Sequence, residues 1–218
     1  MALLEEMLDA MSASKLNALY LHLTDDNCWP LEVLAFPLLT NPANCSRGCR
    51  GTDGQPGQYY SQAQIRALVA YAADRGIRII PEVDSPGHFN TEHCYPELLT
   101  LGECPCPGAG SHCKAPMTFH GPPDPSTPEL WAFFAKLYQE LASLFPDPYV
   151  SLGGDEAWLT PWTCSPPVES WMKANSFDTA GAARFYERQL EAIVSALIVS
   201  LRFALRSWTD NITDDASC

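Results

Sequence analysis

One segment decides how this chain is expected to fold, and it is Leu152-Gly153-Gly154-Asp155-Glu156. Tyr149 and Val150 precede it and favour a β-strand, so the segment is typical of a buried strand that ends at two carboxyls. The two glycines allow a ligand or a neighbouring backbone to come close. Glycosidic bond hydrolysis is the commonest chemistry that needs two carboxyls there, one of them protonated to donate to the leaving oxygen. A turn with solvated acids is the alternative for this motif alone.

Helices and strands are expected to alternate along the rest of the chain. Three more strands are expected to end in polar residues: residues 16–23 at Thr24-Asp25-Asp26, residues 77–80 at Pro81-Glu82-Val83-Asp84, and a strand near residue 203 at Ser207-Trp208-Thr209-Asp210. The helical spacing of apolar residues predicts helices between them, over residues 3–13, 61–76, from residue 126 onward, and 179–200. Residues 85–125 and the stretch after Glu156 are expected to be loops. This order is typical of an α/β fold with a parallel sheet.

The positions of the acidic clusters narrow the fold further. They follow the carboxyl ends of expected strands, where open parallel sheets and (β/α)8 barrels alike place their active sites. A doubly wound sheet would normally carry a glycine-rich phosphate turn, which this sequence lacks, so we expect a barrel. A complete barrel takes roughly 250 residues, whereas the chain has 218 residues. The sequence therefore predicts an incomplete (β/α)8 TIM-type barrel of about four parallel strands with flanking helices.

The composition is that of a globular protein with an acidic surface. Hydrophobic residues make up 46% of the chain and charged residues 18%, which is typical of a packed domain. The formal net charge of −13 leaves no surface that could neutralise nucleic-acid phosphates. No apolar run is long enough to span a membrane.

The cysteines and the first residues of the chain give opposite indications about the secretory pathway. Nine cysteines and two glycosylation sequons, Asn44-Cys45-Ser46 and Asn211-Ile212-Thr213, are typical of a protein of the secretory pathway. The start of the chain has no basic segment or small-residue cleavage site, and so no signal peptide. We therefore expect that the chain lacks its true N-terminus.

A metal site is the first alternative to acid catalysis. Histidines and aspartates at the strand ends could bind zinc, but they lie on different strands without the short spacing of histidine ligand pairs. Cys104, Cys106, His112 and Cys113 could also hold zinc, although disulfides fit an oxidising compartment better. We therefore expect neither a metal nor a cofactor.

Three motifs occur in order at suitable separations: Asn17-Ala18-Leu19-Tyr20-Leu21-His22-Leu23-Thr24-Asp25-Asp26-Asn27-Cys28-Trp29-Pro30, Pro81-Glu82-Val83-Asp84-Ser85-Pro86-Gly87-His88 and Leu152-Gly153-Gly154-Asp155-Glu156. Together they closely resemble glycoside hydrolase family 20, the β-N-acetylhexosaminidases, over nearly the whole chain. The loop after Glu156 looks most like those of lysosomal and secreted eukaryotic members.

The resemblance implies that residues 1–218 are part of a catalytic domain without the N-terminal strand and the C-terminal strands of its barrel. The implied activity is hydrolysis of terminal non-reducing N-acetyl-β-D-glucosamine or galactosamine residues of glycoconjugates or chito-oligosaccharides. For the full-length protein it implies a lysosomal or secreted location and leaves a homodimer open. A catalytically inactive fragment or a carbohydrate-binding remnant is the alternative.

The resemblance also assigns catalytic roles. In this family the 2-acetamido oxygen of the substrate attacks the anomeric carbon, so no enzyme nucleophile is needed. Glu156 is then the general acid and later the base, and we expect burial to keep it protonated at mildly acidic pH. Asp155 orients the acetamide and stabilises the cationic intermediate. His88 with Asp25 resembles the relay that holds the proton and the orientation of the acid.

Further residues are implied to frame the site. Asp84 supports the catalytic network, His22 and Asp84 belong to the substrate-binding set, and Trp208 matches a tryptophan that walls the acetamide pocket. The resemblance places Cys104 and Cys164 in neighbouring loops, where a disulfide between them would tie down the rim of the site.

Overall fold

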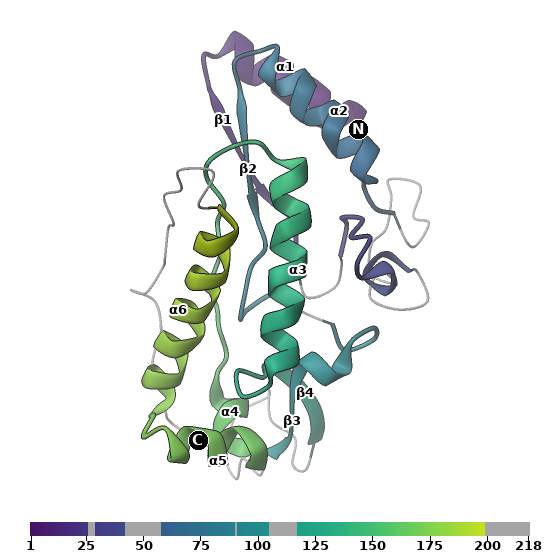
Figure 1. Ribbon diagram of the computed structural model, residues 1–218. Coiled ribbons are helices and arrows are strands. Elements are labelled where there is room, and N and C mark those ends of the chain that lie inside the picture. Colours follow the sequence, from purple (N-terminus) through teal and green to yellow (C-terminus); the bar gives the residue numbers. More distant parts are fainter. Residues whose placement is uncertain (26–28, 42–57, 90, 105–116, 199–218) are drawn as a thin grey trace.

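The computed structural model describes residues 1–25, 29–41, 58–89, 91–104 and 117–198. As far as α3, its helices and strands occur in the order expected from the sequence, apart from an added pair of strands, and three consecutive helices follow α3 (Figure 1). In chain order they are α1 (Ala2–Ala13), β1 (Ala18–His22), η1 (Pro37–Thr40), α2 (Gln62–Ala73), β2 (Arg78–Glu82), η3 (Pro96–Leu98), β3 (Leu99–Cys104), β4 (Met117–Pro123), α3 (Pro128–Leu144), α4 (Thr160–Cys164), α5 (Pro166–Ala174) and α6 (Thr179–Ile198).

Parallel pairing brings the polar ends of two strands, and of a third segment bridged to them, to one edge. β1 and β2 pair in parallel, with His22 opposite Glu82. Glu82 also forms a parallel bridge with Ser151, whose N–H donates to the carbonyl of Pro81 at 2.9 Å. Because parallel segments share a direction, the residues that follow each of them emerge on the same side of the sheet.

The helices bury apolar faces around this sheet. α3 and α6 lie side by side along much of their length (Figure 1). The face of α3 predicted from helical spacing is confirmed, since Leu130, Phe133, Phe134, Leu137 and Leu141 are all buried. α2 packs on β2 and on α3. Its predicted capping box is present, with Ser61 and Gln64 each bonding the backbone of the other.

Two expected loops contain regular structure. β3 and β4 form an antiparallel pair within residues 85–125, and α4 and α5 lie between Glu156 and α6. The strands of this pair include glycine and prolines, which are turn signals in sequence. α4 and α5 both begin with proline in the first turn, where its missing N–H costs no hydrogen bond. The prolines therefore predicted a loop where the structure has the short helices α4 and α5.

The described residues support an α/β fold with parallel pairing, but four parallel strands are not confirmed, because the strand expected before Asp155 is present only as a bridge between Ser151 and Glu82. The strand expected near residue 203, with Trp208 at its end, lies outside the described residues. Among the residues that the structure describes, no helix is both long and apolar enough to cross a membrane.

Candidate active site

His88 stands between two carboxylates that come from different strand ends. Its Nε2 lies 3.2 Å from Oε2 of Glu156, and its Nδ1 lies 3.9 Å from Oδ1 of Asp25. The side chain of His88 is 19% exposed, whereas those of Asp25 and Glu156 are 60% and 78% exposed. The structure thus brings together three of the predicted catalytic residues around one half-buried imidazole.

The backbone at this edge has an unusual conformation. His88 and Glu156 have positive φ angles of 51° and 50°, a conformation that costs a residue with a side chain roughly 1–3 kcal/mol. Gly153, at φ 67°, is so close to the β2 end that a Cβ atom would collide with Asp84. Gly153 therefore serves the close approach that the sequence predicted, whereas a Cβ at Gly154 would lie 3.9 Å from the nearest atom, the carbonyl oxygen of Ser85.

Asp84 and Asp155 form a carboxyl pair beside His88. Asp84 is fully buried, and its Oδ1 accepts a hydrogen bond from the N–H of Gly154 at 2.7 Å. Its Oδ2 accepts none from the described residues. Burial and the neighbouring Asp155 raise the pKa of Asp84 to about 8. The hydrogen bond to Asp84 lowers the pKa of Asp155, so Asp84 holds the proton and Asp155 the charge.

His22 lies next to the same cluster. Its Nδ1 is 2.6 Å from Oε1 of Glu82, and its ring meets that of His88 edge to face, with centroids 6.1 Å apart. Sequence reasoning did not assign Glu82 a role. The available signal was its position two residues before Asp84, since alternate residues of a strand face the same side.

Among the residues that the structure describes, two groups of side chains have the donor atoms for a metal ion. His22, Glu82 and Asp84 form one group and Asp84, His88 and Asp155 the other, each with ligand atoms within 4.8 Å of one another. Proton sharing between Asp84 and Asp155 accounts for the second group without a cation.

The exposure of Glu156 differs from what the sequence predicted. A buried general acid was predicted, but its side chain is 78% exposed. Glu156 lies beyond Ser151, the residue bridged to β2, and no described element covers its side chain.

Cys164 takes part in a disulfide, whereas the side chain of Cys104 lies outside the described residues. The pairing of Cys104 with Cys164 therefore stays a prediction.

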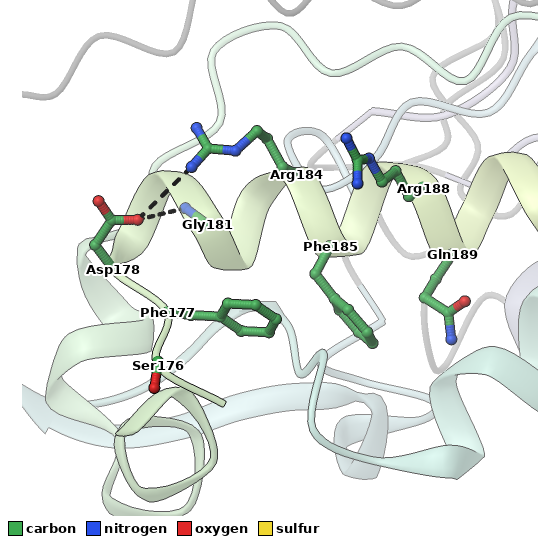
Figure 2. Close-up of a pocket in the computed structure, with 8 residues that line it drawn as sticks. All are labelled: Ser176, Phe177, Asp178, Gly181, Arg184, Phe185, Arg188 and Gln189. Carbon is green, nitrogen blue, oxygen red and sulfur yellow. Dashed lines mark hydrogen bonds and ion pairs between the residues drawn. The ribbon is translucent and has the colours of Figure 1, made fainter. Parts of the chain in front are cut away.

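A separate hollow of about 540 Å³ lies at the N-terminal end of α6 (Figure 2). Phe177, Phe185, Arg184 and Arg188 are among the residues that line it. Asp178 accepts a hydrogen bond from the N–H of Gly181 at 2.6 Å, so its carboxylate is engaged at the helix start. None of the predicted catalytic residues lines this hollow.

Comparison with known proteins decides the family. The model of the glycosyl hydrolase family 20 catalytic domain matches residues 1–217. The chain belongs to glycoside hydrolase family 20. The family predicted from three sequence motifs is thereby confirmed, and its fold is consistent with the α/β order of the elements.

Similar proteins carry hexosaminidase names. The chain is 34% identical over 193 residues to beta-hexosaminidase subunit beta of Mus musculus, and 36% identical over 192 residues to subunit alpha from the same organism. Each match covers 87% of this chain and 33% of the relative, so the chain spans about a third of their length. The crystal structure of a GH20 exo beta-N-acetylglucosaminidase from Vibrio harveyi in complex with N-acetylglucosamine superposes with a TM-score of 0.74 and 29% identity, over 93% of this chain and 32% of that one.

Proposed function

We propose that the chain is part of a β-N-acetylhexosaminidase that removes terminal non-reducing N-acetyl-β-D-glucosamine or galactosamine by a retaining, substrate-assisted mechanism. The observation that carries the proposal is the placement of His88 between Asp25 and Glu156, next to the unequal pair of Asp84 and Asp155. This arrangement supplies one proton donor and one fixed negative charge, which are what such a reaction needs.

Glu156 is the general acid in this mechanism. Its protonated carboxyl donates to the glycosidic oxygen, while the 2-acetamido oxygen of the substrate bonds to the anomeric carbon and the leaving alcohol departs. Glu156, now a carboxylate, accepts a proton from water as that water attacks the anomeric carbon. This attack breaks the bond between the anomeric carbon and the acetamide oxygen, and the acetamide is restored. His88, with Nε2 3.2 Å from Glu156, orients the acid, and Asp25 orients His88.

Asp155 stabilises the charged intermediate. The acetamide nitrogen becomes positive when its carbonyl oxygen attacks, so a fixed anion beside the N–H lowers the barrier. Asp84 keeps Asp155 anionic because the single proton of the pair resides on the buried carboxyl. His22 and Trp208 are proposed to contact the sugar.

We propose that residues 1–218 are a partial catalytic domain of a longer, lysosomal or secreted enzyme, in which further barrel elements cover Asp25 and Glu156. Their exposed fractions of 60% and 78% support this, because a general acid works best in a desolvated site. An inactive fragment is the competing hypothesis. The substrate is a glycoconjugate or a chito-oligosaccharide.

Hydrolysis of 4-nitrophenyl N-acetyl-β-D-glucosaminide tests the proposal. The assay compares a chain extended to the length of the relatives with the same chain carrying Glu156→Gln and Asp155→Asn. We expect turnover by the extended chain and its loss in the double variant. An extended chain that folds but does not turn over this substrate or its galactosamine counterpart would contradict the proposal.

A further inference from the structure

A line of hydrogen bonds crosses β1, β2 and the segment bridged to β2, beside the candidate active site. The hydroxyl of Tyr20 donates to Oγ of Ser151 at 2.6 Å, and the hydroxyl of Ser151 donates to Oε2 of Glu82 at 2.6 Å. Nδ1 of His22 lies 2.6 Å from the other oxygen of Glu82. Tyr20 and His22 belong to β1, Glu82 to β2, and Ser151 to the segment bridged to it.

The protons in this line have one consistent direction. Ser151 has a single hydroxyl proton, and because its oxygen accepts from Tyr20, that proton goes to Glu82. Burial raises the pKa of Glu82, while the hydrogen bond from Ser151 and the charge of His88 oppose the rise and Asp155 adds to it. A Glu82 carboxylate has only acceptor oxygens. When Glu82 is ionised, the ring nitrogen of His22 that faces it therefore carries the hydrogen.

We propose that Glu82 is a positioning residue that holds neutral His22 with its hydrogen on Nδ1, so that Nε2 is the acceptor His22 offers to the open site. Which ring nitrogen carries the proton is set by the hydrogen bond that the ring makes. Glu82 is 5% exposed, whereas the side chain of His22 is 41% exposed at the strand edge.

This tautomer gives His22 a defined chemical preference. A neutral ring with Nε2 unprotonated accepts a hydrogen bond and donates none there, so it selects a hydroxyl or N–H donor of a ligand. That His22 meets a sugar hydroxyl rests on the proposed function. The tautomer itself does not, since it is set by Glu82 and is measured without substrate.

Nitrogen-15 NMR of the histidine rings in the 218-residue chain tests the inference. Long-range proton–nitrogen correlations distinguish the two neutral tautomers, at a pH well above the ordinary histidine pKa of ~6.5. Loss of one ring signal set in His22→Gln assigns His22. We expect hydrogen on Nδ1 of His22, and hydrogen on Nε2 would overturn the proposal whether or not the chain hydrolyses any glycoside.

Two variants separate the role of Glu82 from that of its neighbours. Glu82→Met keeps the length of the side chain but removes the acceptor, and the hydrogen of His22 is expected to move mainly to Nε2. Tyr20→Phe removes the outer donor without touching His22, and the tautomer is expected to stay unchanged. An unchanged tautomer in folded Glu82→Met would overturn the role of Glu82. If Glu82→Met does not fold, the unmodified chain still decides the proposal.

Discussion

Asp84 and Asp155 divide one proton unequally. Asp84 is fully buried with a pKa raised to about 8, and Asp155 is exposed with a lowered pKa. The difference follows from position, because Asp84 lies beneath the strand edge and Asp155 lies on it. The pair predicts both a pH dependence of stability and a division of roles in catalysis.

Asp84 makes the fold less stable as the pH rises. Its folded-state pKa lies above its ordinary value of 3.8, so its contribution is full below about pH 4 and is lost as the pH rises towards 8. Asp155 has the opposite sign, and its contribution is lost on acidification below its ordinary value. Asp84→Asn should flatten the decline between pH 5 and pH 8, whose limit is about 1.4 kcal/mol per pH unit for one proton. Urea unfolding of both proteins at pH 5 and pH 8 measures the free energies of unfolding. An equal change between the two pH values in both proteins would contradict the prediction.

Gly153 should tolerate no side chain. Gly153→Ala places a Cβ atom against Asp84 in a left-handed conformation, and we expect the free energy of unfolding to fall by more than ~2 kcal/mol. Gly76 is the matched control, since its φ of 69° is similar but nothing lies within 4 Å of its Cβ position. Gly76→Ala should cost only about 1 kcal/mol. Thermal or urea unfolding compares them, and equal losses would argue against the close approach.

Part of this architecture was readable from the sequence. Strong periodicity predicted the buried face of α3, because it is a local pattern. The strand expected before Asp155 is present only as a bridge between Ser151 and Glu82. The β3–β4 pair and the helices α4 and α5 were missed because their glycine and prolines are turn signals locally. The exposure of Glu156 was also missed, since it depends on what covers a residue rather than on the residue itself.

The contacts between side chains of different strands could not be predicted from the sequence. His88 and Glu156 are far apart in sequence, and the motifs alone placed them at strand ends without fixing which atoms meet. The line from Tyr20 through Ser151 to Glu82 is likewise invisible in sequence, since parallel register decides it.

Glu156→Gln should separate leaving groups in the extended enzyme. A poor alcohol leaving group needs protonation, so its hydrolysis should slow by about 10²–10⁴-fold. An activated aryl leaving group needs little protonation, so its release should slow much less. Rate constants for both substrate classes measure this, and equal losses on the two would remove Glu156 from the role of general acid.

Asp155→Asn should weaken the stabilisation of the intermediate. We expect kcat to fall by about 10²–10³-fold in the extended enzyme, while the leaving-group dependence set by Glu156 persists. A thiazoline analogue of the cyclic intermediate should bind far more tightly than the substrate to the parent enzyme, and it should lose most of that advantage in Asp155→Asn. Unchanged inhibition by the analogue would contradict the role of Asp155.

In the proposed mechanism the acetamide of the substrate, rather than an enzyme carboxylate, attacks the anomeric carbon beside Asp155 and Glu156. Proton NMR of the first-formed sugar, with mass spectrometry of the extended enzyme quenched during turnover, tests it most directly. We expect the β-anomer of the free sugar to appear first and no sugar to be bonded to the protein. An α-anomer as first product, or a sugar covalently attached to any carboxylate, would contradict it.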